Sequence, residues 1–206
     1  CEGCHGAGSN HAKNMKENIS YKDYGHIEKE NLVDNFASCH SRRTALSHDM
    51  NPHKDFNNFY IAQKLVSPFY HPDGQINDEV YVYSSFLSSK MYQNNVICTD
   101  CHNPHTNKLK FEGNALCTQC HESNKFNSPS HTNHEENSEG SLCINCHMDG
   151  KNYMGNDDRR DHSFRIPRPD QSVKYGTPNA CNSCHENKSE EWAAKNVEKW
   201  FGTERE

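Results

Sequence analysis

The sequence predicts a mostly irregular fold with short α-helices and little or no β-sheet, built around bound cofactors. Three observations lead to this prediction. Apolar residues make up only 32% of the 206 residues, against roughly 45–50% in an ordinary soluble domain. A chain this polar struggles to bury enough side-chain surface to offset its conformational entropy. The same chain contains 11 Cys and 15 His, far more than a disordered linker carries, so it is expected to hold a non-protein group.

Ten of the eleven cysteines occur in five Cys-x-x-Cys-His motifs, at residues 1–5, 98–102, 117–121, 143–147 and 181–185. This pattern is the attachment signature of c-type heme, in which two thiols add to the porphyrin and the histidine binds the iron. Zinc ribbons and disulfide frameworks also use cysteine pairs, but neither requires a histidine after each second cysteine. The predicted attachment residues are Cys1, Cys4, Cys98, Cys101, Cys117, Cys120, Cys143, Cys146, Cys181 and Cys184, and the proximal ligands are His5, His102, His121, His147 and His185.

A sixth stretch, FASCH at 36–40, keeps Cys39 and His40 but has Phe36 in place of the first cysteine. We expect Cys39 to form a single thioether, His40 to bind iron and Phe36 to pack against the porphyrin edge. The alternative is a free cysteine beside an ordinary histidine. The prediction is therefore six c-type hemes, five doubly attached and one singly attached.

Six hemes leave about 34 of the 206 residues for each, so the polypeptide is mostly a wrapping around stacked cofactors. Only 14 residues separate His102 from Cys117, and 21 separate His121 from Cys143. Neighbouring porphyrins must then pack nearly in contact. The expected architecture is one multiheme cytochrome c domain over 1–206, with two heme sites in 1–76 and four in 77–206.

The sixth coordination position decides whether a heme carries electrons or binds substrate. Nine histidines lie outside the motifs, enough for six positions. His105 should reach a neighbouring iron, and His131 and His134 are expected to supply one ligand between them. The favoured distal candidates are His11, His71, His105, His131, His134 and His162, followed by His26, His48 and His53.

Two segments have helical patterns. Apolar positions in 77–93 favour a helix with acidic residues in its first turn, although Val80 to Tyr83 are β-formers. Segment 189–201 is a clearer helix, capped by Ser189 and ended by Gly202, whose aromatic residues should pack in the core or on heme. Residues 157–170 are expected to form an extended loop with four arginines, which either form a solvated cluster or pair with heme propionates.

The formal charge is −6, and six hemes would add roughly twelve propionate charges. Nucleic-acid binding is therefore disfavoured, and redox proteins or extracellular electron acceptors are the expected partners. No apolar run is long enough for a transmembrane helix. The chain begins inside a motif, so we expect an exported, extracellular or periplasmic protein whose signal peptide is not in this sequence.

The run CEGCHGAGSNH at 1–11, together with the stretches 73–121 and 143–194, resembles the heme-rich region of bacterial multiheme c-type cytochromes with tetratricopeptide repeats. These are similar to the tetraheme electron carriers of ammonia oxidisers and to the nitrite reductase and hydroxylamine oxidoreductase group. The resemblance implies bis-histidine hemes in stacked pairs, mostly helix and loop, outside the cytoplasm. It also implies a complete motif at 36–40, from which Phe36 departs, and further motifs and repeats beyond this chain.

Two functions follow from this reasoning. The leading prediction is electron transfer, through a periplasmic shuttle or an extracellular conduit that polymerises head to tail into a conducting filament. A histidine donated across the subunit boundary would lock such a contact. The alternative is a multiheme reductase of nitrite, hydroxylamine or a sulfur oxyanion, which needs one heme without a sixth protein ligand.

Overall fold

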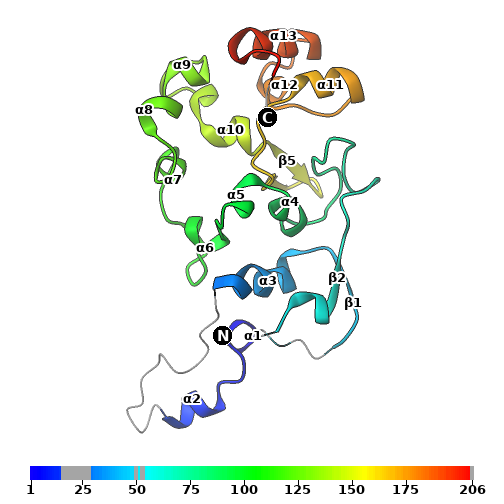
Figure 1. Ribbon diagram of the computed structural model, residues 1–206, viewed down its shortest axis with the longest axis vertical. Helices are drawn as coiled ribbons and strands as arrows, with labels where there is room; N and C mark the ends of the chain where they lie inside the picture. The colour runs from blue at the N-terminus through cyan, green and yellow to red at the C-terminus, as the bar shows by residue number, and fades with distance from the viewer. Residues whose placement is uncertain (15–28, 49–50, 52–53, 205–206) are drawn as a thin grey trace. The chain divides into compact units, whose positions relative to one another are not determined.

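The computed structural model describes residues 1–14, 29–48, 51 and 54–204. Two of the distal candidates, His26 and His53, lie outside the described residues. Figure 1 shows short helices and hairpins joined by irregular segments. The helices are α1 (Glu2–His5), α2 (Ser9–Asn14), α3 (Lys29–His40), α4 (Tyr83–Leu87), α5 (Lys90–Gln93), α6 (Cys98–Cys101), α7 (Ala115–Thr118), α8 (Ser123–Phe126), α9 (Pro129–Thr132), α10 (Cys143–His147), α11 (Pro169–Tyr175), α12 (Ala180–Cys184) and α13 (Glu190–Phe201), with the 3₁₀ turns η3 (Phe56–Asn58) and η4 (Glu139–Ser141).

The described strands form three two-stranded antiparallel sheets. Each sheet is a short ladder: β1 (Arg43–Ala45) with β2 (Tyr60–Ala62), β3 (His102–Asn103) with β4 (Lys108–Leu109), and β5 (Gly150–Tyr153) with β6 (Asp157–Arg160). The predicted fold class, short helices and irregular chain with little β-sheet, is confirmed. None of the described helices is both long and apolar enough to cross a membrane.

The chain divides into two compact units, Cys1–Lys64 with Val80–Ser84, and Leu65–Glu79 with Ser85–Glu206. The first unit contains the motif at 1–5 and the FASCH stretch, and the second contains the other four motifs. Each unit has a small apolar core. Val33, Ala37 and Phe56 are buried in the first, whereas Phe86, Tyr153 and Val197 are buried in the second.

Large apolar side chains remain exposed on the second unit, among them Leu109, Phe111 and Met154. A core this limited agrees with the low apolar content of the sequence.

The helix expected over 77–93 is wrong in its first third. Helix α4 starts only at Tyr83, because Tyr81 has a positive φ of 60° that a right-handed helix does not allow. The acidic residues therefore lie outside the helix, and Glu79 pairs instead with Arg159. The pattern is also interrupted after Leu87, and Ser89 caps a separate helix, α5, by accepting from the backbone N–H of Tyr92.

The helix expected over 189–201 is correct. Ser189 accepts from the backbone N–H of Trp192, Glu190 and Glu191 lie in the first turn, and Gly202 follows the last residue with φ of 80°. Residues 157–170 are more ordered than the expected loop, since they include strand β6 and the first two residues of α11. All four arginines of this stretch contact protein groups, as described below.

Candidate heme-binding sites

Each complete Cys-x-x-Cys-His motif begins in or beside a short helix, although α7 stops at Thr118 before Cys120 and His121, and His102 already belongs to strand β3. The backbone N–H of the histidine donates to the carbonyl of the first cysteine at 2.8 Å in His5, 3.0 Å in His121 and 2.9 Å in His185. This hydrogen bond closes one turn of backbone, which keeps the two cysteines and the histidine of a motif close together. All eleven cysteines are free, so both thiols of every motif are available for attachment to a porphyrin.

In the first unit, helix α3 is tied to the first motif. The side-chain amide of Asn35, which is buried, donates to the carbonyl of Cys4 at 2.9 Å. Cys39 and His40 are exposed at the end of α3, and Phe36 lies three residues earlier, half-buried. Positions three apart share a helix face, so Phe36 stands where the first thiol of a complete motif would be.

In the second unit, three motif histidines each lie opposite a histidine from outside the motifs. The ring centroids are 6.3 Å apart for His102 and His162, 6.2 Å for His131 and His147, and 6.1 Å for His134 and His185. Two imidazoles bound through nitrogen at about 2 Å to opposite sides of one metal ion have centroids roughly 6 Å apart. The planes of the three pairs are inclined by 25°, 10° and 31°, close to parallel.

Backbone carbonyls orient three of these six rings. The Nδ1 atoms of His134, His147 and His162 lie 2.6, 2.8 and 2.9 Å from the carbonyl oxygens of Thr132, Arg165 and Arg160. A carbonyl can only accept, so Nδ1 carries the proton in each ring and Nε2 is left with its lone pair. This is the tautomer that a metal-binding histidine adopts, with the second nitrogen held by the surrounding protein.

Helix α13 packs along the His134–His185 pair. The ring of Trp192, near the start of the helix, lies 5.0 Å from His185, and that of Trp200, near its end, lies 6.4 Å from His134. The neighbouring Phe201 lies 5.8 Å from His131 of the adjacent pair. The sequence prediction that these aromatic residues pack in the core or on a heme site therefore has a specific form: they contact the imidazoles.

Phe126 lies between two sites. Its ring packs edge-on against His121 at 5.8 Å and against His131 at 5.3 Å. In the part of the chain that the structure describes, the aromatic ring that packs against His121 is thus a phenyl group rather than a second imidazole. His121 also helps to lower the pKa of His147, mainly lowered by burial, which indicates that the two motif histidines lie near each other.

The cysteines of successive motifs are neighbours. A hydrogen bond between Cys117 and Cys143 raises the pKa of the Cys117 thiol and lowers that of Cys143 to about 7. Burial raises the pKa of Cys146 to about 11, and the nearby Cys181 adds to this shift. The attachment cysteines of these three successive motifs therefore lie next to one another.

The other distal candidates that the structure describes lie in turns and short helices. His71 precedes a tight turn closed by Gly74, and its pKa is lowered mainly by burial. His105 lies between β3 and β4, His11 in α2, and His48 beyond β1. One detail differs from expectation: His131 and His134 each face a separate motif histidine, because the αL residue Asn133 between them turns the chain.

Several residues at these sites have no signal in the sequence. The carbonyls of Thr132, Arg160 and Arg165 are invisible to any pattern, because every residue has a carbonyl. Gly140 also contacts His134: a Cβ atom at this position would lie 2.2 Å from the ring. The arginines of 157–170 bind carboxylates or carbonyls of the protein, with Arg159 to Glu79, Arg165 to Asp73 and Arg168 to Asp170.

Repeated Cys-x-x-Cys-His turns beside paired imidazoles fit covalently bound heme, and this construction defines the class of multiheme c-type cytochromes. Two comparisons with known proteins support this class. Residues 92–126 match the family described as "Doubled CXXCH motif". The fold is similar to that of the outer cell wall cytochrome OcwA, with a TM-score of 0.67 and 18% sequence identity.

The similarity to OcwA covers 97% of this chain and 56% of the OcwA chain. The chain therefore spans little more than half the length of that cytochrome, and at this identity the likeness establishes the fold alone. No curated protein sequence matches the chain significantly.

Proposed function

We propose that this protein transfers electrons through closely packed bis-histidine c-type hemes. Each heme iron, when bound, accepts and releases one electron, and the protein supplies attachment, axial ligands and spacing. The observation that carries the proposal is the set of three imidazole pairs, whose centroids are 6.1 to 6.3 Å apart. An iron held by two protein ligands exchanges electrons without binding a substrate.

The proposal assigns axial ligands in the second unit as His102 with His162, His147 with His131, and His185 with His134. Cysteines of the motifs at 117–121, 143–147 and 181–185 adjoin one another, which favours electron exchange between neighbouring hemes. For the remaining irons, at His5, His40 and His121, the distal candidates are His11, His26, His48, His53, His71 and His105.

The proposed cofactor content is six hemes, five held by two thioethers and one held by Cys39 alone. Phe36 lies on the same face of α3 as Cys39 and is half-buried, which suits a ring packed against the unattached porphyrin edge. The relationship to the tetratricopeptide cytochromes and the carriers of ammonia oxidisers is part of the same proposal.

The proposed location is extracellular or periplasmic, and the similarity to an outer cell wall cytochrome supports it. Redox proteins or extracellular electron acceptors are the proposed partners. We also propose that copies of the chain associate head to tail into a conducting filament, with a histidine of one copy completing an iron site of the next. The site at His121 suits such a donation, since the phenyl ring of Phe126 packs beside this imidazole.

The same observation favours the alternative function. If the iron at His121 has no sixth protein ligand, it could bind nitrite, hydroxylamine or a sulfur oxyanion, and the other hemes would deliver electrons to it. The two proposed functions therefore differ in whether the iron at His121 has a histidine as its sixth ligand.

Two measurements on the protein purified with its hemes test the proposal. Intact mass counts the covalently attached hemes, with six expected. Electron paramagnetic resonance (EPR) of the oxidised protein should contain only low-spin ferric signals if every iron has two imidazoles. A stoichiometric high-spin signal would favour the reductase over the electron carrier, and fewer than three low-spin bis-imidazole sites would refute the ligand assignments.

A further inference from the structure

Segment 160–165 contains one proposed axial histidine, His162, and contacts another, His147, from a different pair. The carbonyl of Arg160 accepts the Nδ1 proton of His162 at 2.9 Å, and the carbonyl of Arg165 accepts that of His147 at 2.8 Å. His162 faces His102, whereas His147 faces His131. Six consecutive residues thus orient one imidazole at each of two sites.

The start of this segment is attached to the helix that bears the fourth complete motif. Strand β6 pairs with β5 so that Arg160 lies opposite Gly150, which returns the chain to the end of α10. There the guanidinium of Arg160 donates through Nη1 to the carbonyls of Ile144 and Met148, each at 3.2 Å, and to the side chain of Asn145 at 2.9 Å.

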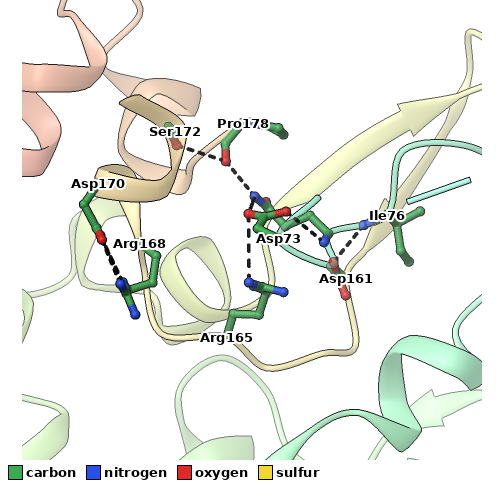
Figure 2. A network of polar contacts seen from close by, with 9 residues as sticks. Asp73, Ile76, Asp161, Arg165, Arg168, Asp170, Ser172 and Pro178 are labelled. Atoms are coloured by element: carbon green, nitrogen blue, oxygen red, sulfur yellow. Dashed lines mark hydrogen bonds and ion pairs between the residues drawn. The ribbon is translucent and has the colours of Figure 1, made fainter. Parts of the chain in front are cut away.

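Asp161 and Arg165 hold the middle and the end of the segment. The carboxylate of Asp161 accepts from the backbone N–H of Ser163 at 2.8 Å and from that of Ile76 at 3.3 Å. Arg165 points toward Asp73, whose carboxylate lies 3.9 Å away and is almost fully buried (Figure 2). The contacts with Ile76 and Asp73 are both with one irregular stretch of the same unit. The segment is therefore held by this stretch on one side and, through Arg160, by helix α10 on the other.

Phe164 shows that the fixation imposes an unfavourable backbone conformation. Its φ is 48°, a left-handed value that is unfavourable for a non-glycine residue. In this conformation its ring packs edge-on against His162 at 5.8 Å and against Phe86 at 6.3 Å. The strained residue therefore contributes a second contact to the same imidazole that the carbonyl of Arg160 orients.

We propose that segment 160–165 is a shared positioning element, which fixes the orientation and the Nδ1 hydrogen bonds of axial ligands at two neighbouring irons and thereby sets their redox potentials together. This inference rests on the ligand assignments of the proposed function. A hydrogen bond from Nδ1 to a carbonyl makes the imidazole a stronger electron donor, which favours the ferric state. Loosening the segment weakens both bonds, so both potentials rise.

The test uses Arg160→Gln in the full chain loaded with heme, followed by potentiometric titration and EPR. The expected result is a rise in the midpoint potential at two sites, with altered g-values at the same two, while the remaining sites keep their values. Two reference variants identify these sites: His162→Met changes the ligand at the His102 iron, and His131→Met changes it at the His147 iron.

The matched control is Arg168→Gln. Arg168 is an arginine of the same stretch that pairs with Asp170 at 2.7 Å, and this pair lies apart from the contacts of Asp161 and Arg165 (Figure 2). Its replacement should leave all potentials unchanged.

Unchanged potentials in Arg160→Gln, a change at the His147 site alone, or an equal change in Arg168→Gln would each overturn the proposal. If Arg160→Gln does not assemble, Asp161→Asn takes its place, since it removes one of the two backbone hydrogen bonds that Asp161 accepts, and the same two sites must shift. The EPR spectrum of the wild-type protein tests the proposed ligand pairs without any variant. It therefore distinguishes failure of the proposed function from failure of this further inference.

Discussion

Replacing Gly140 with alanine should remove the sixth ligand from one iron. Gly140 lies in η4, and an ideal Cβ built on it falls 2.2 Å from Cδ2, 2.5 Å from Cγ and 2.8 Å from Nε2 of His134. Ordinary contacts of a Cβ begin at 3.4 Å, so the ring must retreat by about 1.2 Å. The backbone of Gly140 is not left-handed, and the steric clash is the relevant effect.

The imidazole has little freedom to retreat while keeping its place opposite His185. Its Nδ1 donates to the Thr132 carbonyl at 2.6 Å, and Trp200 packs against its edge. An iron–nitrogen bond of about 2 Å does not stretch by half its length. We therefore expect His134 to leave the iron, and overpacking to lower the free energy of unfolding by about 1–3 kcal/mol.

EPR and visible spectroscopy of the oxidised Gly140→Ala protein provide the assay. One heme should change from low spin to high spin, and added imidazole should restore the low-spin signal by filling the vacated position. Gly113→Asn is the control, because nothing lies within 4 Å of a Cβ there and asparagine tolerates the left-handed φ of 55°. An unchanged low-spin spectrum in the Gly140→Ala protein would refute the assignment of His134 as an axial ligand.

Three further predictions concern other sites. Cys39→Ser should lower the intact mass by one heme, whereas an unchanged mass would show that Cys39 is not an attachment residue. Trp200→Ala should lower the free energy of unfolding by about 1–3 kcal/mol and broaden the EPR signal of the His134 site, since the ring beside that imidazole is lost; calorimetry measures the first effect, and an unchanged spectrum would contradict the second. Burial lowers the pKa of His131 and His147, so protons compete less with iron for these rings, and their low-spin signal should persist as the pH falls through the ordinary imidazole range. Loss of this signal at the pH where free histidine titrates would contradict that prediction.

The outcomes for the two predicted helices show where sequence patterns suffice. Helix α13 is fixed by local signals, a serine cap, acidic residues in the first turn and a glycine after the last, and the structure has all of them. In 77–93 the same kind of pattern is overruled. Val80 is almost fully buried, and Tyr81 adopts a positive φ, because tertiary packing outweighs a weak helical propensity.

The distal histidines illustrate a different limit. Counting residues shows that nine histidines lie outside the motifs, but it did not predict that His131 and His134 face two different motif histidines. The left-handed Asn133 between them, with φ of 54°, directs the two side chains to separate sites. Three-residue spacing alone is compatible with either arrangement.

The sequence by itself determined the cofactor chemistry and the class of fold. Thioether attachment and the proximal ligand depend on five consecutive residues, so the motif is complete wherever it occurs, and a chain with so few apolar residues needs cofactors to form a core. The tertiary structure alone decided which imidazoles face each other, which carbonyls orient them, and that Gly140 and segment 160–165 contact these rings. Those features join residues far apart in the chain through backbone atoms and close contacts. The pattern of side-chain types does not reveal backbone contacts or close packing of this kind.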